Sequence, residues 1–305
     1  FETELDANTT VVFSNPPASG TPVTTGYNLS GATFVDSFSI LSQEGVVEDI
    51  TFNANGTKMF IVGSNGDEVN EYALSTGFDV STASFTQNFS VSSQDTNPTA
   101  IAFNSDGTKM FIVGNANDTV YQYGLTTGFD ISTASYSSTS FSLSSQENNP
   151  KGLAFNSDGT KMFVAGESGD DVNEYTLSTG FDVSTASYSQ NFSVASQDSN
   201  PTGLFFTSDG TRMYITGNTS ESVYEYTLTT GFDVSTASYS SNSFDVGTAE
   251  ETAPRGVAFN SNGTKMFVVG PAGDDVNEYT TTTSTLNDST AYAMSLKVVQ
   301  DSGAS

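Results

Sequence analysis

The sequence predicts an all-β protein that repeats one unit five times, and three observations support this. First, the motif Gly-Thr-Lys/Arg-Met-Phe/Tyr starts at Gly56, Gly107, Gly159, Gly210 and Gly263, with spacings of 51, 52, 51 and 53 residues. Second, each unit contains short runs of β-branched and aromatic residues between Gly, Asn and Asp turns, without helical periodicity. Third, each unit divides into four such runs. Repeats of this length and content are typical of a β-propeller, here with five four-stranded blades.

The unit from Asn97 to Leu143 shows the expected blade, whose four strands are 98–103, 109–113, 119–125 and 136–143. Small residues in the first strand, Ala100 and Ala102, suit the crowded centre of a ring. The Asp-Gly pair before Thr108 supplies the positive φ that a tight hairpin turn needs. The second strand is nearly all apolar, as in a strand buried on both faces. The longer, polar fourth strand is expected at the rim.

Two irregularities in the repeat are informative. Units two and four have one extra residue before the closing strand, as 136–141 shows against 85–89, and a β-bulge would absorb it. The third strand alternates between Asp/Glu-Val-Asn-Glu-Tyr in units one, three and five and Val-Tyr-Gln/Glu-Tyr in units two and four. This alternation is expected from duplication of a pair of blades.

The ring is expected to close with a strand from the N-terminal side. Residues 25–40 match the end of a unit but have no blade of their own, whereas the fifth unit supplies three strands up to about Thr283. Joining them completes the blade and removes an exposed edge. In the alternative, 291–299 is the fourth strand, and the N-terminal strand is free to complete a neighbouring molecule. Loss of the Gly-Phe-Asp turn in unit five favours the internal clasp.

The segments outside the repeat are Phe13-Ser-Asn-Pro-Pro-Ala-Ser-Gly-Thr21 and Ala291-Tyr-Ala-Met-Ser-Leu-Lys-Val-Val-Gln-Asp301, with their neighbours. Placed end to end, they resemble a hairpin common in phage tail-fibre and related virion β-domains. The resemblance implies that the propeller, residues 24–286, is inserted at the hairpin tip. Residues 1–23 and 287–305 are then expected to pair as a small β stem, and its strands are expected to contact other copies of the chain.

The repeat units themselves resemble the broad family that carries Asp-Gly-Thr-Lys-Met-Phe-Val repeats in surface and virion proteins. The resemblance implies the propeller fold strongly, but propellers host many activities. It favours an extracellular or virion-surface location. The chain begins at Phe1, which indicates a processed protein or a fragment.

Composition excludes several classes of function. With 35 acidic and 8 basic residues, the formal charge of −27 repels nucleic acids and anionic membranes. No apolar run has the length of a membrane span, so membrane insertion is not expected. The chain has no Cys and no His, which removes disulfides, thiolate metal sites and the usual nucleophilic triads. The acidic surface favours hard cations such as Ca²⁺.

Two sets of loops are expected on one face of the ring: the connections from each fourth strand to the next first strand, and the loops between second and third strands. Their repeated amides and carboxylates are candidate ligands for glycan hydroxyls, and for Ca²⁺ as a cofactor. The predicted ligand-binding residues are Gln43, Glu44, Gln94, Asp95, Gln146, Glu147, Gln197 and Asp198, and the predicted metal ligands are Asp67, Asp118, Asp170, Asp171, Asp274 and Asp275. The alternative is that these residues only shape polar loops.

Two further repeated features have a structural interpretation. Five basic residues begin the second strands, Lys58, Lys109, Lys161, Arg212 and Lys265. We expect them to pair with nearby acids such as Asp106, Asp158 and Asp209, or to cover apolar surface, rather than to hold an anionic ligand. The Gly-Phe-Asp turns are expected to bury their Phe between strands, with the Asp bonded to the amides that follow.

The predicted function is a non-enzymatic structural or adhesive surface module of a virion fibre or extracellular filament, which makes multivalent contacts through the propeller. One alternative is a Ca²⁺-assisted, lectin-like propeller that binds cell-surface glycans. Another is a carbohydrate-active hydrolase, which would need one unequal pair of carboxylates that near-identical blades do not readily build.

Overall fold

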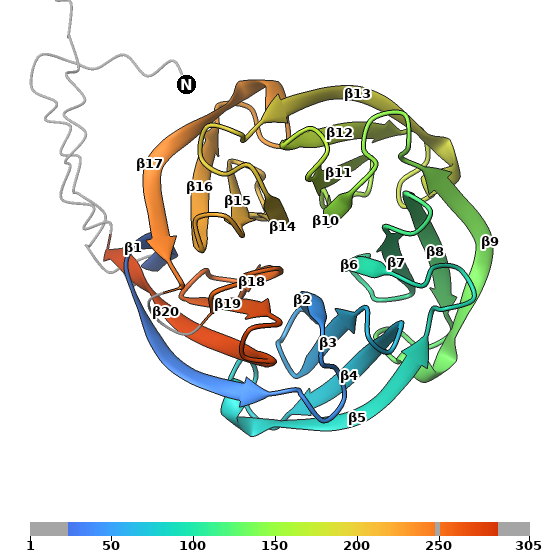
Figure 1. Cartoon of the computed structure of the whole chain (residues 1–305), viewed down its shortest axis with the longest axis horizontal. Helices are drawn as coiled ribbons and strands as arrows, with labels where there is room; N and C mark the ends of the chain where they lie inside the picture. The colour runs from blue at the N-terminus through green and yellow to red at the C-terminus, as the bar shows by residue number, and fades with distance from the viewer. Residues whose placement is uncertain (1–23, 248–250, 286–305) are drawn as a thin grey trace, which may run out of the picture.

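The computed structural model describes residues 24–247 and 251–285 and contains five four-stranded antiparallel sheets arranged as a ring (Figure 1). Each sheet is a blade, with its first strand at the centre of the ring and its fourth at the rim. Blade 1 comprises β2 (Val47–Phe52), β3 (Lys58–Gly63), β4 (Glu68–Leu74) and β5 (Ala83–Ser90); blade 2 comprises β6 (Pro98–Phe103), β7 (Lys109–Gly114), β8 (Thr119–Leu125) and β9 (Ala134–Ser142). Blade 3 comprises β10 (Pro150–Phe155), β11 (Lys161–Gly166), β12 (Asp171–Leu177) and β13 (Ala186–Ser193); blade 4 comprises β14 (Pro201–Phe206), β15 (Arg212–Gly217), β16 (Ser222–Leu228) and β17 (Ala237–Asp245). The predicted fold is confirmed.

Blade 5 is closed by the N-terminal side of the chain. It comprises β18 (Val257–Phe259), β19 (Lys265–Gly270), β20 (Asp275–Thr285) and β1 (Thr24–Ser39), in the order β1-β20-β19-β18. β1 runs antiparallel to β20, with Phe34 opposite Tyr279 and Phe38 opposite Val276. The expected clasp is therefore confirmed, and the alternative that 291–299 fills this place is wrong because β1 occupies it. The predicted stem, 1–23 and 287–305, lies outside the described residues.

The extra residue in blades 2 and 4 forms the predicted bulge. In blade 2 the partner of Gln122 is Thr139, but the partner of the next residue, Tyr123, is Tyr136. Two residues are thus left out of the ladder, and one of them, Ser138, takes a left-handed φ of 57°. Ser241 does the same in blade 4 with a φ of 65°. In blade 1 the corresponding gap, between Gln87 and Phe85, leaves out one residue.

The hydrophobic core lies between neighbouring blades rather than within one. For example, Ile50, Met59 and Tyr72 of blade 1 pack with Phe267 and Val276 of blade 5. Between the third and fourth strands of blades 1 to 4 lie short 3₁₀ turns, each after a Gly-Phe-Asp sequence: η1 (Val80–Thr82), η2 (Ile131–Thr133), η3 (Val183–Thr185) and η4 (Val234–Thr236).

The Phe of each Gly-Phe-Asp turn is partly buried, and it packs on the glycine of the repeat motif. Phe78 has a left-handed φ of 59°, and a Cβ added to Gly56 would lie 2.2 Å from its ring. Phe78 also stacks on Phe267 of blade 5, with ring centroids 6.3 Å apart. Asp130 accepts a hydrogen bond from the amide of Ser132, as expected, and Asp182 and Asp233 do the same in blades 3 and 4.

The five basic residues connect each blade to the next. Nζ of Lys58 lies 2.7 Å from Oε1 of Glu71 in its own blade and donates to the carbonyl of Phe129 in the next. The same ion pair within a blade joins Lys161 to Glu174, Lys265 to Glu278 and Arg212 to Glu225. The prediction that these basic residues pair with Asp106, Asp158 and Asp209 is wrong. Each of these Asp side chains instead caps its own turn, by accepting a hydrogen bond from the amide of Thr108, Thr160 or Thr211, respectively.

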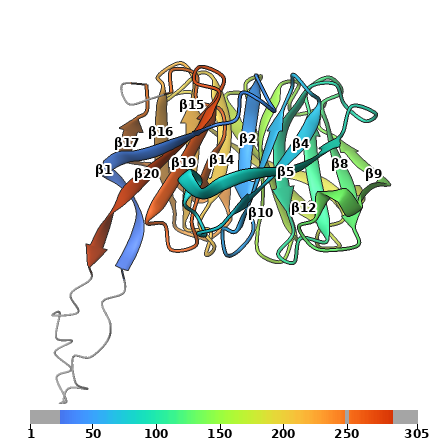
Figure 2. The same ribbon diagram turned by 90° about the horizontal axis from the view of Figure 1, so that it is seen from below.

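The ring has two faces, the connection face and the turn face. The connection face carries the fourth-to-first connections and the second-to-third-strand loops, and the turn face carries the first-to-second turns and the Gly-Phe-Asp turns. The start of β1 and the end of β20 extend side by side from the turn face (Figure 2), where Thr24 is paired with Thr285. Among the described residues, none forms a helix with the length and apolar character of a membrane span.

Candidate functional site

The predicted ligand-binding carboxylates lie on the connection face but point inward. Glu44, Asp95, Glu147 and Asp198 are buried. Asp95 accepts from the amide of Asn97 at 2.8 Å, in the connection, and from that of Ala116 at 3.2 Å, in the second-to-third-strand loop. The structure thus brings the two loop sets together as expected. Each carboxylate joins the two loops of its blade instead of facing solvent.

The predicted ligand-binding amides are half-buried beside these carboxylates. Oε1 of Gln94 accepts a hydrogen bond from the Tyr123 hydroxyl at 3.1 Å, and Oε1 of Gln197 accepts one from Tyr226 at 3.2 Å. Gln43 and Gln146 occupy the same position in blades 1 and 3. Glycan binding by these four residues stays a prediction.

The predicted metal ligands fall into two groups. Asp67, Asp118, Asp170 and Asp274 have left-handed φ angles of 48° to 50°, and their carbonyls accept from the end of the neighbouring fourth strand, as from Val91 in blade 1. Asp171 and Asp275 begin the third strands of blades 3 and 5. Within 24–247 and 251–285, no three Asp or Glu side chains gather in a way that could hold one metal ion. Metal binding by this set therefore needs other ligands as well.

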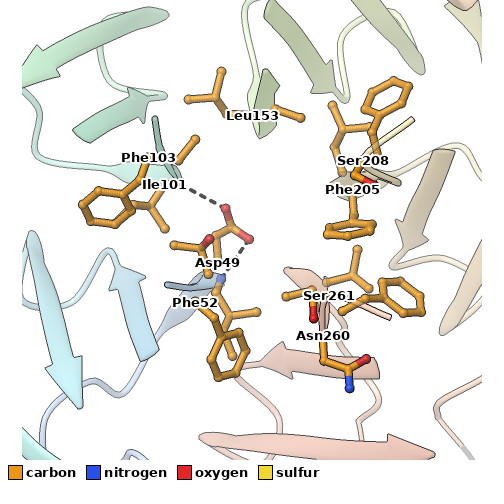
Figure 3. A pocket seen from close by; sticks show the side chains of 18 of the residues that line it. Asp49, Phe52, Ile101, Phe103, Leu153, Phe205, Ser208, Asn260 and Ser261 are labelled. Atoms are coloured by element: carbon orange, nitrogen blue, oxygen red, sulfur yellow. Dashed lines mark hydrogen bonds between the residues drawn. The ribbon is translucent and has the colours of Figure 1, made fainter. Parts of the chain in front are cut away.

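A second site, which the repeat pattern conceals, is the centre of the ring. A cavity of about 500 Å³ lies there, lined by the first strands of all five blades (Figure 3). Its wall combines polar and apolar surface in similar amounts, with Ile101, Leu153 and Phe205 among the apolar lining residues. Asn53, Ser208, Asn260 and Ser261, from the first-to-second turns, line its end at the turn face.

One ionisable carboxyl, that of Asp49, reaches this cavity from blade 1. The equivalent residues of the other blades are Ala100, Gly152, Gly203 and Gly256. Asp49 accepts from its neighbour Ile50 at 2.8 Å and, across the blade boundary, from the amide of Ile101 at 3.0 Å (Figure 3). Burial raises the pKa of Asp49 to about 8, so the carboxyl is mostly protonated at neutral pH.

Charged side chains cluster beside Asp49 towards the connection face. Lys151 lies 3.7 Å from Glu167, and Arg255 lies 3.9 Å from Glu48 and 4.0 Å from Glu167. Burial raises the pKa of Glu48, although the charges of Arg255 and Lys151 oppose this rise. The cluster combines residues of blades 1, 3 and 5, so it has no five-fold symmetry.

Sequence reasoning missed this asymmetric centre, although a signal was present. At the start of the first strands, the five units read Glu48-Asp49, Thr99-Ala100, Lys151-Gly152, Thr202-Gly203 and Arg255-Gly256. These pairs diverge while the motifs around them repeat almost unchanged. Chemically, the residues that line the cavity offer one carboxyl, which can bind a polar group, but they do not supply a pair of carboxylates.

Comparisons with known proteins find only distant structural likenesses. No family model matches the sequence, and no curated protein is significantly similar to it. A functionally unknown protein from Desulfotomaculum acetoxidans matches with a TM-score of 0.45 and 11% identity, over 73% of this chain and 62% of that one. A putative 6-phosphogluconolactonase from Bacteroides uniformis matches with a TM-score of 0.47 and 13% identity, over 76% of this chain and 68% of that one. A second putative 6-phosphogluconolactonase, from Bacteroides fragilis, matches with a TM-score of 0.47 and 14% identity, over 78% of this chain and 68% of that one.

The chain thus spans less than two thirds of the first of these structures and about two thirds of the other two. Likenesses this distant carry no conclusion about activity. The propeller fold of this chain rests on its own strand order.

Proposed function

We propose that this protein is a non-enzymatic structural or adhesive head, displayed on an extracellular filament or a virion fibre. The observation that carries the proposal is that β1 and β20 leave the ring side by side, with Thr24 opposite Thr285. A domain whose two ends are adjacent can be inserted into a host structure without separating the two sides of the insertion. The propeller is then a pendant head, and its host lies beyond the turn face of blade 5.

The rim supplies a repeated surface for contact. Each fourth strand carries one outward aromatic residue that packs on a buried Tyr of the third strand: Phe34 on Tyr279, Phe85 on Tyr72, Tyr136 on Tyr123, Tyr188 on Tyr175, and Tyr239 on Tyr226. Phe34, Phe85 and Tyr188 are 39% to 43% exposed. Weak contacts repeated around one rigid ring gain avidity through effective concentration.

The central cavity supports a non-enzymatic interpretation. Glycoside hydrolysis requires two carboxyl groups on opposite sides of the scissile bond. The residues that line the cavity include one carboxyl, Asp49, and it is held by two backbone amides. A hydrolase is therefore the weaker proposal.

Glycan binding is the second candidate, favoured by the same rim. Exposed aromatic rings such as Phe85 suit the apolar face of a sugar, and exposed Ser and Thr residues of the fourth strands supply groups for its hydroxyls. This candidate differs from a purely structural head in requiring the rim aromatics.

Two experiments test the proposal. Electron microscopy of the native assembly, with a Fab raised against the propeller, should show heads at regular intervals along a filament or fibre; free monomers in native material would refute display. A glycan array should then be run with and without chelator, on the full chain and on a rim variant, Phe34→Ser/Phe85→Ser/Tyr188→Ser. A control variant, Leu41→Ser, removes an exposed apolar residue away from the rim aromatics. Signal lost in the rim variant but kept in the control supports the glycan candidate, and no signal in any form rejects it.

A further inference from the structure

The blades differ in a regular way beside the buried carboxylates of the connection face. Blades 1, 3 and 5 begin the third strand with an acid and have Asn two residues later: Glu68 and Asn70, Asp171 and Asn173, Asp275 and Asn277. Blades 2 and 4 have a hydroxyl residue and Tyr at these positions: Thr119 and Tyr121, Ser222 and Tyr224. The connection acid follows the same rule, being Glu44, Glu147 and Glu251 in odd blades and Asp95 and Asp198 in even blades.

In blade 1, the two acids, the amide and a tyrosine share one face of the sheet. Glu68, Asn70 and Tyr72 alternate along β4, so their side chains lie on the same face. Gly63 is opposite Glu68, and a Cβ on Gly63 would lie 2.2 Å from Cδ of Glu44. The carboxyl of Glu44 therefore occupies the space that this glycine leaves, beside Glu68. Blade 3 repeats the arrangement with Glu147 over Gly166, which is opposite Asp171.

The connection acids of blades 3 and 5 each leave one oxygen without a partner, unlike those of the even blades. In blade 1, Oε1 of Glu44 accepts from Val46 and Asn65, and Oε2 accepts a long bond of 3.4 Å from Gly66. In even blades both oxygens of the Asp are used: Oδ1 of Asp198 accepts from Asn200 and Thr219, and Oδ2 accepts from the amide and hydroxyl of Ser220. In blade 3, Oε1 of Glu147 accepts two backbone amides, but Oε2 is buried without a partner. Oε2 of Glu251 is likewise buried and unpartnered in blade 5.

Other buried polar atoms of the odd blades also lack partners. Asn70 is 0% exposed, and neither its amide nitrogen nor its amide oxygen has a hydrogen bond. The hydroxyls of Tyr72 and Tyr175 are buried and unpartnered, whereas the equivalent hydroxyls of Tyr123 and Tyr226 donate to glutamines. Buried polar atoms are rarely left unsatisfied in native proteins without an unplaced water or ion.

The charge of these sites is also unbalanced. Among the described residues, no Lys or Arg forms an ion pair with Glu44, Glu68, Glu147 or Asp171. Burial raises the pKa of Glu44, and the nearby charge of Glu68 adds to this rise. Burial raises the pKa of Asp171 in the same way, with a further contribution from Glu147.

We propose that each odd blade binds one hard divalent cation of the Ca²⁺ class between its connection Glu and the acid that begins its third strand. The Asn amide oxygen and the Tyr hydroxyl are further oxygen ligands, and oxygen-only coordination is what Ca²⁺ prefers. Two carboxylates per site suffice because amide, hydroxyl and water oxygens complete the shell. Blades 2 and 4 bind no cation, since they lack the second acid. In blade 3 both oxygens of Asp171 accept hydrogen bonds from the side-chain amides of Asn173 and Asn191, and the ion replaces these bonds.

Terbium luminescence tests the proposal on the full chain. The chain has no Trp, so sensitised Tb³⁺ emission reports Tyr residues near the ion. We expect a stoichiometry of three Tb³⁺ per molecule, displaced by Ca²⁺. Glu68→Gln and Asp171→Asn should each lower it to two, and the double variant should lower it to one. The matched even-blade controls, Thr119→Val and Ser222→Ala, should leave three.

A variant that gains a cation site completes the test, because misfolding cannot explain an increase in bound ions. Asp95→Glu/Thr119→Glu/Tyr121→Asn gives blade 2 the residues of blade 1, and it should raise the stoichiometry to four. A stoichiometry that is zero, or that none of these substitutions changes, overturns the proposal, because the ions are then absent or only at the acidic surface. The result is independent of display on a filament, which requires neither the cation nor these residues.

Discussion

At the scale of single residues, the surroundings of a carboxyl group decide its role in this protein. Asp106 sits in an exposed turn, and hydrogen bonds from the side chain and amide of Thr108 lower its pKa. Asp49 is enclosed at the centre of the ring, and burial raises its pKa. Both residues are Asp, so residue type alone does not separate them.

The raised pKa of Asp49 makes stability depend on pH. The pKa is about 8 in the folded protein and close to the unperturbed value, about 4, in the unfolded chain. Between these values the unfolded chain releases a proton that the folded protein keeps, so the free energy of unfolding falls as pH rises through this window. This one group contributes a slope of at most about 1.4 kcal/mol per pH unit. Urea denaturation from about pH 5 to pH 8 should show a flatter slope for Asp49→Asn than for the wild type.

Asp106→Asn is the control for this measurement. Because the pKa of Asp106 is lowered, its stabilising effect is present above the unperturbed pKa and is lost only in more acidic solution. The control should therefore lower stability uniformly from pH 5 to pH 8 and leave the slope unchanged. Equal slopes for the wild type and Asp49→Asn would contradict the assignment.

The basic ring gives a second prediction at this scale. Lys58 pairs with Glu71, whose side chain is 3% exposed, whereas Gln122 takes the place of that Glu in the blade of Lys109. Lys58→Met leaves a buried carboxylate without its cation, and Lys109→Met does not. Both substitutions lose a bond to the carbonyl of a Phe in the next blade. Since Lys58 is itself partly exposed, we expect its substitution to cost about 1–2 kcal/mol more than that of Lys109 in urea unfolding. Equal losses would show that only the carbonyl contact matters.

At the scale of elements, the sequence predicted strands better than partners. The five motifs, the turn glycines and the orphan N-terminal strand fixed the number of blades and their closure, because these features follow from local chain geometry. The bulges were also predictable from one extra residue. The partner of Lys58 could not be predicted from the sequence, because Glu71 lies 13 positions away in the chain and approaches Lys58 only across paired strands. The central cavity was missed for the same reason: Glu48, Lys151 and Arg255, which lie beside it, come together only when the ring is closed.

The clasp can be tested by locking it. Thr33 of β1 and Thr280 of β20 are opposite each other, with Oγ1 atoms 2.7 Å apart. Because the chain has no Cys, Thr33→Cys/Thr280→Cys introduces a single disulfide. It closes a loop that contains most of the ring, so the oxidised form should be about 2–4 kcal/mol more stable than the reduced form of the same variant. Thermal unfolding under both conditions measures this. A fourth strand from elsewhere in the chain would leave the pair unable to form.

At the scale of the whole molecule, like charge opposes compactness. The chain has a formal charge of −27, and the five basic residues of the repeat motif are already committed to contacts between blades. Repulsion among the remaining acids lowers the stability of the folded state.

Monovalent salt should therefore stabilise the protein. Raising NaCl from about 10 mM to about 300 mM shortens the screening length severalfold, and Tm should rise by several degrees. KCl should act equally, since screening depends on ionic strength alone. Glu68→Gln should respond like the wild type, which separates screening from cation binding in the odd blades. A Tm that does not change, or that falls with salt, would show that repulsion is not a significant cost.

The alternation of blade types has a period of two, but the ring has five members, so the pattern cannot close evenly. Blades 5 and 1 are of the same type and become neighbours, whereas every other junction joins unlike blades. The odd number of blades thus creates one seam, the junction between blades 5 and 1. Blade 5 is the blade in which β1 pairs with β20, and its Arg255 faces Glu48 of blade 1. Going round the ring, odd-to-even junctions occur twice, even-to-odd junctions twice and the seam once. A partner that recognises a junction, rather than a single blade, would therefore bind one or two times per ring and never five.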